Sequence, residues 1–202
     1  MTTQRKADLL LVLITGFWGC SYYLSDLALE EMPPFALCAM RFLLAFALLG
    51  IALFPKLRHI NRKTLLWAVP AGLSLTLTYI GATVGLLYTS ISNAGFICSL
   101  PAVTTPLLTF LLYRKKPERR MLLCLALCTV GLGLLTLGND FRPAPGDLIC
   151  LLCALGYGIN LLVVEHAVRQ PEVDALQLGV FQQLVTGAAM LVLSLLFETP
   201  CL

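Results

Sequence analysis

One arginine, Arg41, lies inside an apolar stretch that is long enough to cross a membrane. It is seven residues past Pro34, about 10 Å along a helix that begins there. An arginine at mid-membrane costs at least ~2.5 kcal/mol on insertion, so it usually faces a bundle interior or a water-filled cavity. The nearest acid along the chain is Asp26. Three interpretations of Arg41 stay open: an ion pair with Asp26, a contact for an anion or carboxylate, and a side chain that extends to the head groups.

A later acid, Glu165, lies near the end of another apolar segment, in a place comparable to that of Asp26. Acids within a membrane often serve as proton sites. Asp26, Arg41 and Glu165 are therefore candidates for an ion pair or a proton site. Because Glu165 is close to a helix end, a solvated charge is the favoured interpretation for it.

Aromatic and hydroxyl side chains occupy similar depths in several apolar segments and predict a lightly polar wall for a small ligand. Helix packing explains the same residues equally well. The candidates for this wall, besides Arg41, are Trp18, Ser21, Tyr22, Tyr79, Ser99, Tyr157 and Asn160.

Two further features lie in the middle of apolar segments. Pro101 frees a backbone carbonyl and predicts a helix kink, which is either harmless or a hinge. Of the neighbouring amides Gln182 and Gln183, one is expected to face a cavity and the other to bond a neighbouring helix.

Gly81 and Gly85 form a small-residue face, for which packing within the chain is favoured over a dimer contact.

The cysteines and histidines do not predict a metal centre or a catalytic site. Cys124 and Cys150 fall at opposite ends of antiparallel segments, roughly 20 Å apart in depth. A single zinc ion cannot reach both of them and their neighbours in the helix. The two histidines, His59 and His166, lie at segment ends, so no Ser–His pair is expected. We therefore predict no metal, no cofactor and no enzyme.

The composition identifies the class of protein. Of the 202 residues 58% are apolar and 12% charged, and the mean hydropathy is +0.87. Ordinary soluble domains are about 25% charged. So few charges exclude a nucleic-acid-binding domain and almost any cytosolic enzyme, and they predict a protein embedded in a lipid bilayer.

A helix needs about 20 mostly apolar residues to cross a bilayer. Seven segments meet this requirement, so we predict an all-α integral membrane protein, a bundle of about seven transmembrane helices. They are Asp8–Leu29, Pro34–Phe54, Leu65–Leu87, Ser92–Tyr113, Met121–Leu137, Asp147–Val164 and Ala175–Phe197.

The basic residues predict the orientation. All 14 except Arg41 and Arg142 fall on one side of the predicted spans. Basic loops stay in the cytoplasm. The N-terminus is therefore expected in the cytoplasm of a plasma-membrane protein, and seven spans place the C-terminus outside.

The sixth segment resembles the first when the chain is shifted by 139 residues. The shift aligns Asp8 with Asp147, Gly19 with Gly158, and Asp26 with Glu165. The five helices that begin with the first copy are an odd number, so the second copy enters the membrane from the opposite side. Such inverted repeats are typical of secondary transporters.

The motifs also resemble those of the EamA family of the drug/metabolite transporter superfamily. The matching stretches run along the whole chain. They are Phe17-Trp18-Gly19, Pro33-Pro34, Arg41-Phe42-Leu43-Leu44-Ala45, Tyr88 through Phe96, Arg114-Lys115-Lys116-Pro117 and Gly146-Asp147-Leu148.

This resemblance implies two five-helix repeats and the transport of small metabolites. We therefore predict one complete five-helix EamA repeat over residues 7–138 and the first two helices of an inverted second repeat over residues 146–202. A basic residue is common in the family near the ends of the first and sixth helices, where this chain has Asp26 and Glu165. No role for a cation is carried over to those positions.

The function predicted from these patterns is a secondary carrier that works by alternating access. We expect it to export small neutral or zwitterionic metabolites such as amino acids. The alternative is a truncated or non-transporting membrane protein that acts as an assembly partner. The expected partners are the substrate, the bilayer, and a second copy or another chain that supplies missing helices. Export rather than import is what the family resemblance implies.

Overall fold

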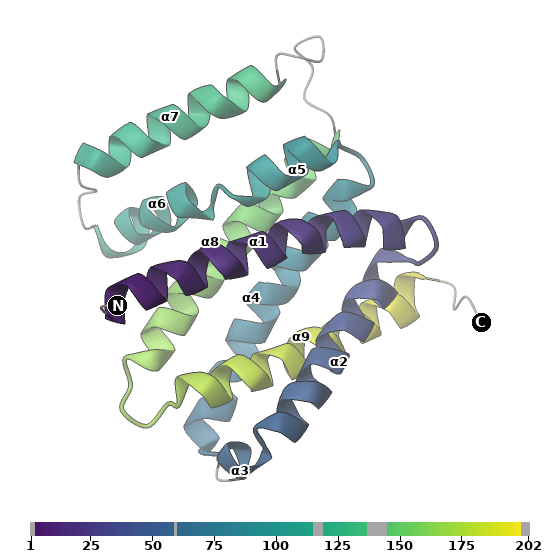
Figure 1. The fold of residues 1–202 in the computed structure, drawn as a ribbon, viewed down its shortest axis with the longest axis vertical. Coiled ribbons are helices and arrows are strands. Elements are labelled where there is room, and N and C mark those ends of the chain that lie inside the picture. Colours follow the sequence, from purple (N-terminus) through teal and green to yellow (C-terminus); the bar gives the residue numbers. More distant parts are fainter. Residues whose placement is uncertain (1–2, 59, 115–118, 137–144, 199–202) are drawn as a thin grey trace.

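The structure is a computed structural model that describes residues 3–58, 60–114, 119–136 and 145–198. Within these ranges all regular structure is helical, which confirms the predicted all-α class. The helices, shown in Figure 1, are α1 Thr3–Leu29, α2 Pro34–Ala52, α3 Phe54–Leu57, α4 Arg62–Leu86, α5 Ile91–Cys98, α6 Pro101–Tyr113, α7 Arg119–Thr136, α8 Pro145–Val168 and α9 Ala175–Phe197.

Local sequence signals set several helix starts. The side chain of Asn61 accepts a hydrogen bond from the Lys63 amide at the start of α4. Ser90 does the same for α5, and Asp174 accepts from two amides at the start of α9. Such N-cap side chains satisfy backbone donors that a helix leaves free. Helix α2 lacks a cap of this kind and begins instead with proline at its first position.

Five of the described helices are long and apolar enough to cross a membrane, namely α1, α2, α4, α8 and α9. They correspond to five of the seven predicted spans. The single span expected over Ser92–Tyr113 is instead two shorter helices, α5 and α6, which meet before Pro101. Proline lacks the amide hydrogen of an ordinary helical turn, so a break at this residue has a direct cause. The seven-span count is therefore not confirmed.

The centre of the molecule is the contact between α4 and α8. A Cβ atom added to Gly81 would lie 2.4 Å from the backbone nitrogen of Cys153. One added to Gly156 would lie 2.8 Å from the backbone nitrogen of Thr78. Only glycine allows two helix backbones to approach so closely. The predicted packing role of Gly81 within the chain is confirmed.

Helix α9 packs against both α2 and α4. A Cβ atom on Gly187 would lie 2.9 Å from the side chain of Leu43 on α2. One on Gly72 of α4 would lie 2.5 Å from Val185 of α9. Between the three helices lies a core of buried side chains, which we call the α2–α4–α9 core. It contains Cys38, Ala39, Phe42, Leu75 and Met190.

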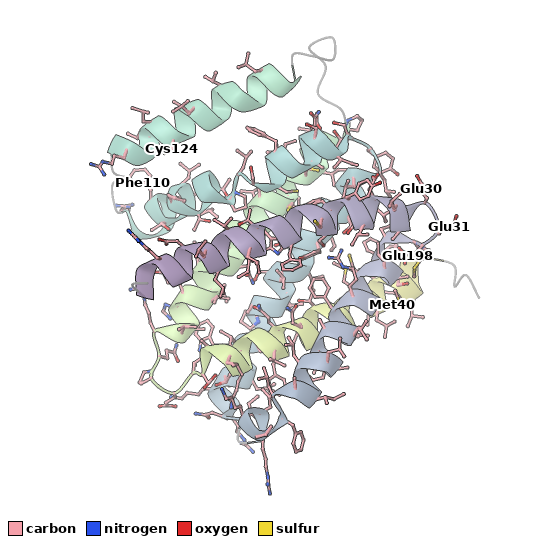
Figure 2. The ribbon with its side chains drawn as sticks, in the orientation of Figure 1. Glu30, Glu31, Met40, Phe110, Cys124 and Glu198 are labelled. Carbon is pink, nitrogen blue, oxygen red and sulfur yellow. The ribbon has the colours of Figure 1, made fainter. Side chains whose placement is uncertain are left out.

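Hydrogen bonds join α9 to α2 at one end and to α3, which directly follows α2, at the other. The Glu198 carboxylate, after the end of α9, accepts from the amides of Phe35 (2.6 Å) and Ala36 (2.8 Å) in the first turn of α2. It therefore supplies the cap that α2 lacks. Figure 2 shows Glu198 at the same end of the molecule as Glu30 and Glu31. At the opposite end, the Gln177 side chain donates to the Lys56 carbonyl at 2.8 Å.

Helix α1 crosses the other helices on one face of the molecule (Figure 1). Most of its apolar side chains are exposed, from Leu9 to Leu27. No side-chain or backbone atom of the described residues would lie within 4 Å of a Cβ atom added to Gly16 or Gly19. The face of α1 that is engaged carries Ser21, Tyr22 and Ser25, and this face contributes to the candidate site.

Candidate functional site

The guanidinium of Arg41 bonds two serines of α1. It donates to the Ser25 hydroxyl at 2.7 Å and to the Ser21 hydroxyl at 2.6 Å. The Ser25 hydroxyl in turn donates to the Ser21 carbonyl, which turns its oxygen lone pairs toward Arg41. Ser25 is buried, with 8% of its surface exposed.

The predicted ion pair between Asp26 and Arg41 is not formed. The ion pairs of the described residues are Lys63–Glu172 and Glu165–Arg169. The reason is helical geometry: Ser21 and Ser25 are four residues apart and share one face, whereas Asp26 is a further 100° around α1. The two hydrogen bonds of the Arg41 guanidinium therefore go to neutral hydroxyls rather than to an acid.

Two pairs of aromatic rings join the helices in this part of the bundle. Trp18 of α1 meets Tyr157 of α8 edge to face, with ring centroids 5.7 Å apart. Tyr79 of α4 meets Phe42 of α2 at 4.6 Å and lies within electrostatic reach of Arg41. Tyr79 and Tyr157 both pack against the α2–α4–α9 core.

The structure thus brings together predicted residues from four helices. We call this group the Arg41 site. It consists of Trp18, Ser21, Ser25, Arg41, Tyr79 and Tyr157. Ser25 was not predicted, although its spacing of four from Ser21 places both hydroxyls on one helical face.

The other candidate residues have different surroundings. Asn160 is buried and donates to the Ala71 carbonyl and the Ser74 hydroxyl, so it joins α8 to α4. Tyr22 packs against a separate core that contains Leu86, Ala94, Ile97 and Cys150. Ser99 is exposed and donates to the Phe96 carbonyl within its own chain segment. Glu165 is exposed and pairs with Arg169.

With this geometry described, comparison with known proteins decides the family. A sequence model of the EamA-like transporter family matches residues 5–137. The chain belongs to the EamA-like transporter family. A relative from Archaeoglobus fulgidus, named as an uncharacterized transporter, is 32% identical over 163 residues. That match covers 81% of this chain and 50% of the relative, so the chain spans about half the length of the relative it matches. No solved structure matches the chain.

Family membership and the apolar helices agree that this EamA protein resides in a membrane. The family and the archaeal relative are both described as transporters, which favours a transporter over an enzyme. Within the described residues, no group of three or more His, Cys, Asp or Glu side chains is arranged to hold a metal ion. Cys150 and Cys153 are buried, whereas Cys124 is exposed on α7 (Figure 2).

The break before Pro101 lies beside the core against which Tyr22 packs, because Cys98 and Leu100 pack against the same core. Helix α5 ends at Cys98, and Pro101 is the buried first residue of α6. The following turn remains attached to α8, because the Thr104 hydroxyl donates to the Ala154 carbonyl at 3.0 Å. In this EamA protein the predicted kink position thus lies between two short helices that both pack against α8.

Asp147 is a buried acid whose role in helix packing the sequence did not indicate. Asp147, at the start of α8, accepts hydrogen bonds from Thr89 and Asn93 in the α4–α5 region. Its position in the first turn is favourable for a carboxylate, because helix amide groups carry partial positive charge there. Sequence motifs matched this residue to the family but gave no indication of its partners.

Proposed function

We propose that this chain forms the ligand-binding part of a secondary carrier for small metabolites that bear a carboxylate, with zwitterions such as amino acids as the expected class. The observation that supports this is the pairing of Arg41 with two neutral hydroxyls rather than an acid. A guanidinium binds carboxylates through paired, charge-assisted hydrogen bonds. The surrounding Trp18, Tyr79 and Tyr157 rings would contact the apolar part of the ligand.

The proposed carrier works by alternating access in the plasma membrane and exports its substrate. Its N-terminus lies in the cytoplasm and its C-terminus outside. Because the archaeal relative is about twice as long as the matched region, further helices from a second copy or another chain are proposed to complete the carrier. The alternative of a non-transporting assembly partner is not favoured, since family and relative are both described as transporters.

The binding experiment uses the full chain in lipid nanodiscs. The twenty amino acids are tested, together with the methyl ester of each one that binds, which lacks the carboxylate charge. We expect Arg41→Ala to weaken carboxylate binding at least tenfold, in line with the ~1.5–3 kcal/mol of a charged hydrogen bond. Arg169→Ala is the matched control, because Arg169 is exposed and pairs only with Glu165 among the described residues.

Transport is measured in parallel as resistance of cells to toxic amino-acid analogues. Cells expressing the wild-type chain should survive higher concentrations than cells with an empty vector or the Arg41→Ala variant. Insertion of each variant in the membrane is verified. Equal binding and equal resistance for wild type and Arg41→Ala would contradict the proposed role of this arginine.

A further inference from the structure

Helix α9 carries two adjacent glutamines, Gln182 and Gln183, in the middle of a largely apolar sequence. The side-chain oxygens of both are buried, and neither has a hydrogen-bond partner among the described residues. The sequence predicts that one of these amides bonds a neighbouring helix, and the structure gives neither oxygen such a bond.

Several other buried polar side chains at these helix contacts do have partners, although the hydroxyls of Thr64 and Thr105 also have none among the described residues. Thr186, also on α9, donates to the Gly72 carbonyl at 3.0 Å. Asn160 donates to the Ala71 carbonyl at 2.8 Å. Gln177, a glutamine of the same helix, donates to Lys56. The fold therefore satisfies buried amides elsewhere, and the pair at 182–183 is different.

An unpaired buried polar group is costly for a purely structural residue. Leaving such a group without a partner costs about 1–3 kcal/mol. Methionine would fill nearly the same volume without that cost. Two adjacent amides whose buried oxygens lack a hydrogen bond therefore indicate a partner that the described residues do not supply.

Gln182 and Gln183 lie on α9, the helix that packs against α2, which carries Arg41. Gln183 shares a face of α9 with Gly187 and Met190, four and seven residues further on. Gly187 lies against Leu43, and Met190 belongs to the α2–α4–α9 core on which Tyr79 and Tyr157 pack. The backbone carbonyl of Gln182 lies beside Gly72 of α4. The amides are thus about 10 Å along α9 from the level of Met190.

We propose that Gln182 and Gln183 form a second contact for the transported molecule, one that accepts hydrogen bonds from an ammonium or amide N–H group. This inference rests on the proposed function, because it requires a ligand that first binds at Arg41. A separation of about 10 Å exceeds the reach of a small amino acid, so the ligand contacts the two sites in turn. Arg41 selects for the carboxylate, and the glutamines select for the hydrogen-bond donor.

The test compares ligands that share a carboxylate and differ in the ammonium group. The probes are leucine with 4-methylpentanoate and phenylalanine with 3-phenylpropanoate, each measured for binding to the full chain in nanodiscs. The variants are the double substitution Gln182→Met and Gln183→Met, the control Gln177→Met, and Arg41→Ala. We expect the second binding event, at the glutamines, to be at least tenfold stronger for the ammonium-bearing member of a pair, and the double variant to lose that preference. Gln177→Met should keep it.

Thermal stability provides a second readout that does not depend on the ligand. Gln177→Met should lower the melting temperature, because it removes the bond to Lys56. The double variant should melt at or above the wild-type temperature, because it removes unpaired polar groups. A fall like that of Gln177→Met would show ordinary structural glutamines and overturn the inference.

The outcomes separate this inference from the proposed function. An unchanged ammonium preference in the double variant overturns the role of the glutamines while Arg41 keeps its role. Equal wild-type affinity for both members of each pair also overturns it. Failure of wild type to bind any of the four probes, or equal binding by Arg41→Ala, overturns the proposed function and the inference together.

Discussion

Helices α1 and α8 are predicted equivalents under the 139-residue shift, yet they are packed very differently. In the most apolar part of α8, 39% of the residues are buried, compared with 6% in α1. Position 17 of α1 is a phenylalanine with 66% of its surface exposed, and the corresponding residue of α8 is Gly156, buried against α4. The same predicted element thus serves two purposes.

The equivalent polar positions repeat this contrast. Asn160 of α8 bonds α4 through the Ala71 carbonyl and the Ser74 hydroxyl. Its counterpart on α1, Ser21, bonds the guanidinium of Arg41. A helix whose polar groups are committed to packing cannot offer them to a ligand without loss of stability. The lesson is that α8 stabilises the bundle, whereas α1 presents the polar groups of the candidate site.

The largest expected effect on folding comes from exchanging the residue types at the equivalent positions Phe17 of α1 and Gly156 of α8. Gly156→Phe places a side chain where a Cβ atom alone lies 2.8 Å from the Thr78 backbone, so α4 and α8 must separate. We expect no folded protein by size-exclusion chromatography of the detergent-solubilised chain. Phe17→Gly on α1 should still fold, with a cost near the ~1 kcal/mol of a glycine in a helix. A well-folded Gly156→Phe variant would refute the contrast between the helices.

An intermediate effect on stability is expected from substitutions at the equivalent polar residues Asn160 and Ser21. Asn160→Leu removes two hydrogen bonds between α8 and α4 while Ser74 still donates to the Ala71 carbonyl, and the two lost bonds should lower the unfolding free energy by about 1–3 kcal/mol. Ser21→Ala should change stability by less than this and weaken carboxylate binding, because Arg41 retains only Ser25. Thermal melting and ligand titration of both variants check the prediction. Equal destabilisation by both would show that Ser21 also serves packing.

The smallest expected effect is on stability, which should fall when one glycine is replaced by alanine and rise when another is. Gly158→Ala places a Cβ atom 3.0 Å from the end of the Leu108 side chain and 3.2 Å from the Thr104 hydroxyl, which can shift slightly. We expect a modest loss of stability. Gly19→Ala meets no atom within 4 Å and should stabilise α1 by about 0.5–1 kcal/mol through helix propensity. Melting temperatures that move in the same direction for both variants would contradict this prediction.

Hydropathy was sufficient to predict the helical class and five long spans, because these depend on local composition. It did not predict the break before Pro101 as a separation into two helices, since proline allows either a kink or a new helix start. The sequence pointed to Arg41 because inserting a charge in a membrane costs free energy. An ion pair with Asp26 was one expectation for it, but helical geometry places Ser21 and Ser25, not Asp26, within hydrogen-bond distance of the guanidinium.

Contacts between residues far apart in the sequence were beyond prediction. Glu198 bonds the start of α2 across 163 and 162 positions, and no local pattern marks it as a cap. The unpaired state of Gln182 and Gln183 is likewise a property of the assembled helices. The contact between the Trp18 and Tyr157 rings also depends on how the helices assemble.

The hydrogen bonds at the two ends of the α2–α9 pair also define a length. Gln177 and Glu198 are 21 positions apart, which corresponds to about 31 Å along an α-helix. The hydrocarbon core of a bilayer is about 30 Å thick. From this match we expect each of these polar contacts to lie at a boundary between lipid tails and head groups. The two contacts would then set the depth of the bundle in the bilayer, and a thinner or thicker membrane would act first on them.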